Sequence, residues 1–323
     1  MIGKNAAPFD RAEWFALLQR SGAQPLVAVA GEGDDRSALA LMRQNGRLEA
    51  LHNWYNFTWR PHGADSRALT VLAADLLERT HRVTLSPVPD EDGSASLLES
   101  AFREAGWHVR REQCDHNHVL PVRSRTFAEY WAQRPGRMRT TVKRKAKKVE
   151  VTISRQFDEN EWAQYEAIYA DSWKPEEGDR DLLRNFAEAE AAAGRLRLGI
   201  ARHDGEAVAA QFWTVENSVA YIHKLAHLES HPQLSAGTTL SAALFEHVID
   251  RDKVELVDFG TGNDAYKRDW MEVDRPRYRI DCLNPRAPRA WPALVKRKLR
   301  SALHGGNAKA KGSDRTAGEQ PPS

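Results

Sequence analysis

Two glycines and a lysine lie close together in the segment 258–270, DFGTGNDAYKRDW. Gly260 and Gly262 follow an apolar run, and a glycine turn lets backbone amides approach a ligand without side-chain hindrance. Lys267 lies just inside a short predicted helix, where its ammonium group could stabilise a phosphate or a developing anion. The same pattern is equally typical of an ordinary strand, turn and helix with charged residues on the surface.

One predicted strand carries two histidines and a lysine. His223 and His227 share one face of this strand, and Lys224 lies on the other. Two histidines on one face could relay a proton, although a buried histidine can also be purely structural. A lysine is costly to bury without a partner, so we expect Asp258 or Asp264 to pair with Lys224.

A sequence of small residues precedes the helix predicted over 237–250. Ser235, Gly237, Thr238 and Thr239 lie at its start. Free amides and the helix dipole attract anions at such a position. The same residues are also typical of a helix cap with no ligand.

An aromatic loop and a cluster of possible metal ligands lie in the first half of the chain. Trp54 and Tyr55 could line a hydrophobic substrate pocket, or the loop could dock into the core. Cys114, His116 and His118 alternate along a strand and so face the same way. No fourth ligand lies near them in the sequence, so we expect no metal.

The periodicity of apolar residues predicts an α+β protein with two related halves. We expect strands at 26–30, 38–42, 48–52, 83–88, 107–110, 118–122, 151–156, 196–203, 208–215, 219–228, 254–259 and 278–282. We expect helices at 64–80, 94–105, 126–133, 137–149, 158–173, 181–193, 237–250 and 265–270. The predicted domains are a first lobe over 1–150, a second over 151–285, a basic helix over 286–304 and a disordered tail over 305–323.

From about Phe127 to Cys282 the chain resembles the BioF2-like or FemAB-like acetyltransferases, a branch of the GNAT superfamily. The resemblance rests on motifs in family order: Ser172-Trp173-Lys174, Gly205 to Gln211, Lys224 to Ala226, Ser235 to Thr238, and the segment 258–270. Ala236 replaces a family proline. His227 and Leu228 replace a tyrosine–aspartate pair, so a family carboxylate is missing or has moved to Glu229.

The resemblance implies two GNAT-like lobes in a Fem-type tandem, with mixed central sheets flanked by helices. It also implies acyl transfer from an acyl-CoA thioester to an amine, with the pyrophosphate of the donor at the start of the 237–250 helix. An amine with a pKa near 10 is mostly protonated at neutral pH, so a base or a proton path is useful. The candidate catalytic residues are Lys224, Asp258, Asp264, Tyr266, Lys267, His223 and His227, and Trp173 and Gln211 are expected to shape the site.

The net charge of +2 conceals two basic segments on an acidic body. Eight basic residues and no acidic one lie in 134–148, and nine basic residues follow Pro285 against two acidic ones. The first segment could meet CoA phosphates, a nucleotide, tRNA, a lipid surface or only solvent. It lacks interleaved aromatic residues for base stacking, which argues against nucleic acid.

The second basic segment has a helical spacing of apolar residues that starts at Trp291. Leu294, Val295 and Leu299 continue it, with Ala302 and Leu303 beyond. A basic helix with a terminal tryptophan is typical of attachment to an anionic membrane surface, although a helix that packs on its own lobe has the same pattern.

Three functions remain open from the sequence. The first is an acyl-CoA-dependent N-acyltransferase, whose amine could be a long-chain sphingoid base as in ceramide synthesis, or a polysaccharide. The second is an aminoacyl-tRNA-dependent transferase of the Fem type, and the third is a non-enzymatic adaptor. With no long apolar run, no signal pattern and two distant cysteines, we expect a cytoplasmic protein, peripheral at the inner face of the membrane.

Overall fold

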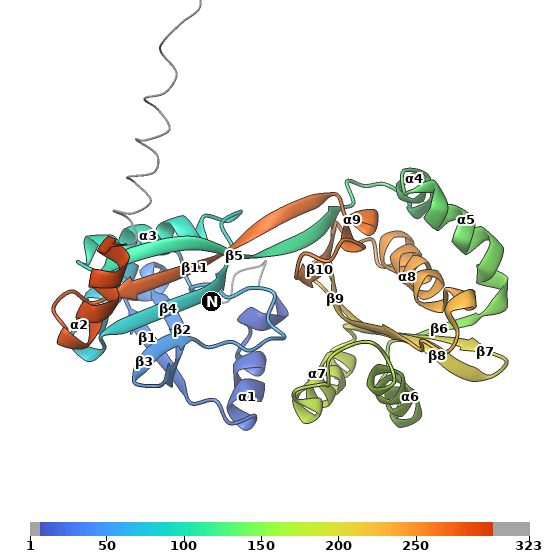
Figure 1. Cartoon of the computed structure of the whole chain (residues 1–323), viewed down its shortest axis with the longest axis horizontal. Coiled ribbons are helices and arrows are strands. Elements are labelled where there is room, and N and C mark those ends of the chain that lie inside the picture. Colours follow the sequence, from blue (N-terminus) through green and yellow to red (C-terminus); the bar gives the residue numbers. More distant parts are fainter. Residues whose placement is uncertain (1–6, 300–323) are drawn as a thin grey trace, which may run out of the picture.

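The computed structural model describes residues 7–299, in which eleven strands form a single sheet (Figure 1). Its order is β1-β2-β3-β4-β11-β5-β10-β9-β8-β7-β6. The strands are β1 (Pro25–Ala30), β2 (Ser37–Gln44), β3 (Arg47–Ala50), β4 (Arg82–Val88), β5 (His108–Pro121), β6 (Glu150–Ser154), β7 (Leu196–His203), β8 (Glu206–Glu216), β9 (Val219–His227), β10 (Leu256–Thr261) and β11 (Val273–Leu283).

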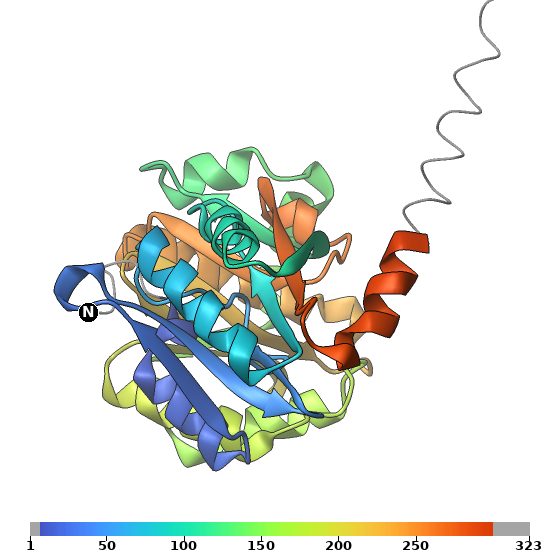
Figure 2. The same cartoon turned by 90° about the vertical axis from the view of Figure 1, so that its left-hand side faces the viewer.

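Helices flank the sheet in two lobes (Figures 1 and 2). They are α1 (Ala12–Arg20), α2 (Ser66–Arg79), α3 (Ser94–Glu104), α4 (Phe127–Ala132), α5 (Gly136–Lys145), α6 (Glu159–Ala170), α7 (Arg180–Ala192), α8 (Ala236–Glu246) and α9 (Lys267–Trp270). In the second lobe, α6 and α7 cover one face of the sheet and α8 covers the other (Figure 1). The predicted α+β class, with a mixed sheet flanked by helices, is confirmed.

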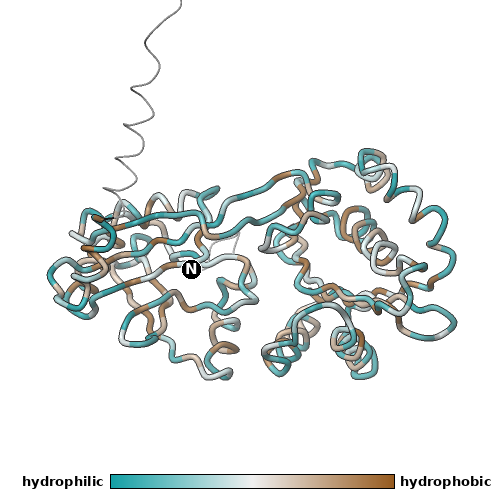
Figure 3. The backbone as a smooth tube through the Cα atoms, in the orientation of Figure 1, coloured by the Kyte–Doolittle hydropathy of each residue, from teal (hydrophilic) through white to brown (hydrophobic). Residues whose placement is uncertain are grey.

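The two lobes share the long strand pair β5 and β11. β11 pairs with β5 from Leu283↔His108 to Val273↔Val119, and it also pairs with β4 of the first lobe. The end of β5 then pairs with β10 of the second lobe. Two short strands predicted at 107–110 and 118–122 were therefore wrong, because they are the ends of one strand. Its polar middle crosses between the lobes, where no apolar core imposes an alternating pattern (Figures 1 and 3).

The N-terminal part of the chain also crosses from one lobe to the other. Trp14 packs edge-on against Phe186 of α7, with ring centroids 5.1 Å apart. Arg11 forms a buried ion pair with Glu190, at 2.6 Å. The division at residue 150 stays a prediction, and both ends of the described chain pack across it.

Other predicted boundaries agree with the structure to within five residues, the largest difference being the start of β11, at Val273 rather than 278. The helix predicted over 237–250 differs in kind, because α8 ends at Glu246 and continues as a π-helical turn over His247–Arg251. Residues 291–299 are helical, as expected, whereas 300–304 and the tail predicted over 305–323 lie outside the described residues.

Candidate active site

The site lies where the parallel strands β9 and β10 separate. Their ladder runs from Leu256↔Val219 to Asp258↔Tyr221 and ends there. Beyond this point β9 stays paired with β8, and β10 has a bulge against β5. A cavity of about 250 Å³ lies at the opening, and we call it the reaction cavity. Its lining comprises Trp54, Tyr55, Phe57, Tyr169, Lys174, Pro175, Ile222, His223, Lys224, Leu225, Phe259, Gly260, Thr261, Asp264, Tyr266 and Lys267.

The glycine turn closes one side of the reaction cavity. Gly260 has φ +70°, and a Cβ atom there would lie 2.8 Å from the ring of Phe57, so only glycine fits without displacement. The amide of Gly260 donates to Asp258 at 2.8 Å, and the amide of Gly262 donates to the carbonyl of His116 at 3.1 Å. The expectation that these glycine amides serve a ligand was therefore wrong, because both are used to hold the turn.

Lys267 holds the same turn from the start of α9. Its buried ammonium group donates to the carbonyls of Thr261 and Gly262 and lies 3.6 Å from the carboxylate of Asp264. Burial lowers the pKa of Lys267, and Asp264 opposes that shift. Lys267 therefore shapes the cavity wall, and its role as an anion stabiliser stays a prediction.

Lys224 has a different partner from the one expected. Its ammonium group lies 3.0 Å from the carboxylate of Glu177, in the loop between α6 and α7, and both side chains are buried. The ammonium also lies over the ring of Trp54, 4.0 Å from its centroid, and 5.0 Å from that of Tyr169. Burial lowers the pKa of Lys224, and Glu177 opposes the shift.

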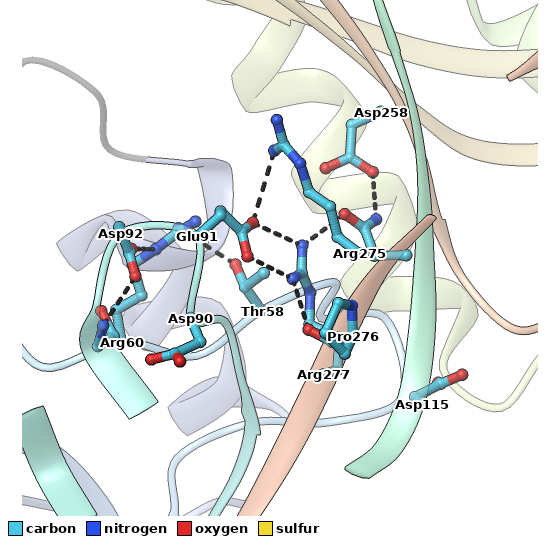
Figure 4. Close-up of polar contacts among 12 residues, drawn as sticks. Thr58, Arg60, Asp90, Glu91, Asp92, Asp115, Asp258, Arg275, Pro276 and Arg277 are labelled. Atoms are coloured by element: carbon cyan, nitrogen blue, oxygen red, sulfur yellow. Dashed lines mark hydrogen bonds and ion pairs between the residues drawn. The ribbon is translucent and has the colours of Figure 1, made fainter. Parts of the chain in front are cut away.

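Asp258 cannot serve as this partner because it is engaged on the other side. Its carboxylate accepts from Asn117 Nδ2 at 2.6 Å, and Asn117 in turn accepts from Arg277. Figure 4 shows Asp258 beside this network, which Glu91 extends. Burial raises the pKa of Asp258, and Arg277 and Asn117 oppose the shift. Asp258 lines a separate cavity of about 620 Å³ between the lobes.

The two histidines of β9 occupy different surroundings. The ring of His223 packs against Phe212 and Phe186, with centroids 5.0 and 5.1 Å away, and contacts Thr214 Oγ1 at 2.8 Å. Burial lowers the pKa of His223 to about 3, so its ring is neutral at pH 7. His227 instead packs against Trp173, with ring centroids 4.3 Å apart and the planes tilted by 48°, and burial lowers the pKa of His227 as well.

The N-terminus of α8 adjoins the end of β9. Ser235 is the N-cap residue of α8, with φ +50° and no capping bond from its side chain. The hydroxyl of Ser235 instead accepts from Lys145 Nζ of the basic helix α5, at 2.9 Å. Gly237 packs against His227, whose Nδ1 would lie 3.1 Å from a Cβ atom. The positive charge of Lys145 therefore lies at the start of α8, next to Gly237 and Thr238.

Gln211 and Trp173 lie outside the lining of the reaction cavity. Buried Gln211 donates to Ser241 Oγ at 2.7 Å and to the carbonyl of Gly237 at 3.2 Å, and so joins β8 to α8. Trp173 is 44% exposed above His227. Thr239 is buried, and its hydroxyl has no partner among the described residues.

Glu177, Tyr169 and Lys174 are site residues that the sequence reasoning missed. All three lie in or next to the loop after α6. Glu177 could have been suspected from Lys224, because a buried lysine needs a carboxylate partner. The sequence contains several carboxylates that could fill this role, so it did not single out Glu177. The pattern Cys114, His116, His118 does not form a site, since no three potential metal ligands converge within residues 7–299. His116 instead pairs with Asp274 at 2.9 Å.

Residues 136–268 match the family model described as an acetyltransferase (GNAT) domain. This segment of the chain is therefore a GNAT-type acetyltransferase domain. The matched range contains β9, α8 and β10, and it supplies all of the lining of the reaction cavity except Trp54, Tyr55 and Phe57. No curated protein gives a significant sequence match.

Solved structures show where else this GNAT fold occurs. FemX is similar with a TM-score of 0.61 and 11% identity, over 87% of this chain and 93% of FemX. The C-terminal domain of a putative lysylphosphatidylglycerol synthetase from Agrobacterium fabrum has a TM-score of 0.57 and 15% identity, over 88% and 91%. A tandem GNAT protein from the clavulanic acid biosynthesis pathway has a TM-score of 0.50 and 16% identity, over 88% and 91%. These likenesses show the fold, including its two-lobed arrangement.

Within the part of the chain that the structure describes, no helix is both long and apolar enough to span a bilayer. The helix over 291–299 lies against the first lobe, where Arg297 pairs with Asp281. Trp291, Val295 and Leu299 are exposed by 54%, 56% and 60%, and their spacing of four places them on one face. The helix therefore packs on its own lobe, as one alternative expected, but leaves these three apolar side chains exposed, and attachment to a membrane stays a prediction.

Proposed function

We propose that this GNAT enzyme transfers an acyl group from an acyl-CoA thioester to an amine in the reaction cavity. The observation that carries the proposal is the arrangement along β9. Lys224 lines the cavity, and three residues later His227 contacts Gly237 at the start of α8. At about 3.3 Å per residue, this separation is on the order of 10 Å. A thioester tethered to phosphates at α8 would therefore reach the cavity.

Two groups would hold the phosphates of the donor. The first-turn amides of α8 attract anions through the helix dipole. Lys145 adds a positive charge at Ser235. Lys143, Arg144, Lys147 and Lys148 are exposed and remain available to the rest of the nucleotide or to solvent. This arrangement supports CoA phosphates as the partner of the basic segment.

The residues of the cavity suit the chemistry of acyl transfer. The amine nitrogen forms a bond to the thioester carbonyl carbon, the carbon–sulfur bond breaks, and the amine loses protons. The oxyanion that forms requires a positioned donor. Lys224 is such a donor, and Tyr266 is another. Burial, aided by Asp264, raises the pKa of Tyr266, so its hydroxyl keeps its proton at neutral pH. His227, neutral at pH 7, stays the candidate base on the α8 side of the cavity.

The experiment combines a thermal shift with an activity assay on the full chain. Acetyl-CoA, a long-chain acyl-CoA and free CoA are expected to raise the melting temperature, because ligands that bind only the native state stabilise it. Release of CoA thiol with a panel of amines then identifies transfer. If aminoacyl-tRNA stabilises the protein and no CoA thioester does, the acyl donor is aminoacyl-tRNA, as in a Fem-type transferase.

A lipid amine, such as a long-chain sphingoid base, is the acceptor that we favour. Its support is the exposed stripe of Trp291, Val295 and Leu299 beside exposed Lys296. Such a face suits an anionic membrane surface and would bring the enzyme to lipid substrates at the inner face of the membrane. If the acceptor amine is instead on a polysaccharide, the enzyme should be active without vesicles and should not bind them.

A further inference from the structure

A second cavity, of about 330 Å³, adjoins the reaction cavity and lies between α6, α7 and the loop that joins them. Tyr169 and Lys174 line both cavities and so separate them. The lining comprises Trp162, Tyr165, Glu166, Tyr169, Ala170, Lys174, Glu176, Glu177, Arg180 and Leu183. We call this space the α6–α7 cavity.

Three buried polar atoms of this lining have no hydrogen-bond partner among the described residues. They are Glu177 Oε2, Tyr165 Oη and Trp162 Nε1. Tyr165 is 2% exposed, and the side chain of Glu177 is 6% exposed. Buried polar groups are normally paired, since leaving them unpaired costs the full desolvation of the group. Two of the three, Glu177 Oε2 and Tyr165 Oη, can accept a hydrogen bond from a ligand, whereas the indole N–H of Trp162 can only donate.

The lining favours a cation. The lining contains three carboxylates, Glu166, Glu176 and Glu177, against two basic residues, Lys174 and Arg180, so its formal charge is negative. Carboxylates beside the faces of tyrosine and tryptophan rings form a typical ammonium site.

The protein already holds one ammonium group in this way. Lys224 Nζ lies 3.0 Å from Glu177 Oε1 and 5.0 Å from the ring centroid of Tyr169. Tyr55 Oη also donates to Oε1, whereas Oε2 has no partner. One carboxylate oxygen therefore serves the reaction cavity, and the other is left for the α6–α7 cavity.

We propose that the α6–α7 cavity binds a primary alkylammonium group, held by Glu177 Oε2 and Tyr165 Oη, with its apolar stem against Trp162 and Leu183. As the binding site of the acceptor, this rests on the proposed function, because the cavity then delivers the amine past Tyr169 to the thioester. The proposal that the cavity binds an ammonium group does not depend on whether the enzyme uses acyl-CoA.

The test is calorimetric titration of the full chain, without acyl-CoA, with hexylamine and with hexanol. The two probes share an alkyl stem and differ in charge. We expect hexylamine to bind and hexanol to bind at least about tenfold more weakly, since hydrogen bonds to charged groups are the stronger ones. Equal binding of the two probes, or binding of neither, overturns the proposal.

Tyr165→Phe is the decisive variant, because it removes a hydroxyl that has no partner within residues 7–299 and so should leave the fold intact. It should weaken hexylamine binding several-fold and leave hexanol unchanged. Tyr278→Phe, on β11 of the other lobe, is the matched control and should bind hexylamine as the parent does. Equal affinity of both variants for hexylamine contradicts the assignment.

A separate thermal shift with acetyl-CoA distinguishes the two proposals. If hexylamine binds and acetyl-CoA does not, the proposed acyl-CoA donor is rejected and the ammonium site is kept. If acetyl-CoA binds and the binding of hexylamine does not depend on its charge, the ammonium site is rejected and the acyl-CoA donor is kept.

Discussion

Glu177 and Lys224 form a buried ion pair, 3.0 Å between carboxylate and ammonium, that joins the α6–α7 loop to the central strand β9. The same loop also contacts β9 where Trp173 packs against His227. Together these two contacts hold the loop against β9, and the ion pair is the one that lies at the wall between the reaction cavity and the α6–α7 cavity.

Removal of one member of this pair should destabilise the protein strongly. Lys224→Met leaves the charge of Glu177 buried and unpaired, and we expect a loss of about 3–5 kcal/mol in the free energy of unfolding. Lys224→Met combined with Glu177→Leu should recover most of that loss. Chemical denaturation measures all three free energies. A double variant as unstable as the single one would show that the ion pair is not the cause.

Gly260→Ala should disrupt the glycine turn by two separable effects. The positive φ strains any other residue by about 1–2 kcal/mol, and the added Cβ atom also meets the ring of Phe57 at 2.8 Å. Gly205→Ala is the matched control, because Gly205 has φ +83° with nothing within 4 Å of its Cβ position. The variant at Gly260 should therefore be the less stable in thermal denaturation, and Phe57→Leu should partly restore it.

Lys145→Ala should weaken the binding of acyl-CoA by about tenfold, since it removes one charge-assisted contact at α8. Lys143→Ala, exposed on the same helix, should have a much smaller effect. Titration at low and high salt measures both affinities. Equal losses in the two variants would indicate general electrostatic attraction rather than a site at α8.

His223 should contribute to acid sensitivity. Its folded pKa of about 3 lies below the unfolded value of 6.5. Between these values the unfolded chain binds more protons, so stability falls as the pH is lowered from about 6.5 toward 3. His223→Phe removes that proton uptake and should flatten the dependence of unfolding free energy on pH between 7 and 5. An unchanged slope would exclude His223 as a source.

The helix over 291–299 should bind anionic vesicles through its exposed face. Val295→Ser with Leu299→Ser removes apolar area but keeps the charge, and should reduce co-sedimentation with phosphatidylserine vesicles severalfold. Val27→Ser with Val29→Ser is the control, since these β1 valines are comparably exposed, by 60% and 53%. Equal binding by both double variants would remove the helix as the anchor.

The sequence predicted the parts of this fold that repeat a local pattern. Seven of the predicted residues line the reaction cavity: Trp54, Tyr55, His223, Lys224, Asp264, Tyr266 and Lys267. These residues lie in or near regular elements. The predicted alternation along β9 was wrong at His223, because the register of β9 against β8 shifts there and turns His223 to the side of α6 and α7, where Lys224 also lies.

Two errors at the site concern contacts between distant segments. Asp258 was a reasonable partner for Lys224, but pairing of β10 with β5 directs it to Asn117 instead. The glycine amides were expected to be open, but β5 supplies the carbonyl that occupies one of them. Both outcomes depend on the neighbour of β10 in the sheet, which no local spacing specifies.

The insertion of β11 between β4 and β5 also governs how the protein can be made. Synthesis proceeds from the N-terminus, so β4 and β5 leave the ribosome long before residues 273–283 exist. Until then the first lobe has two unpaired strand edges, which are open to association with other chains. The sheet of the first lobe can therefore be completed only after the second lobe has been synthesised. A chain that stops before β11 should be unable to fold the sheet in either lobe.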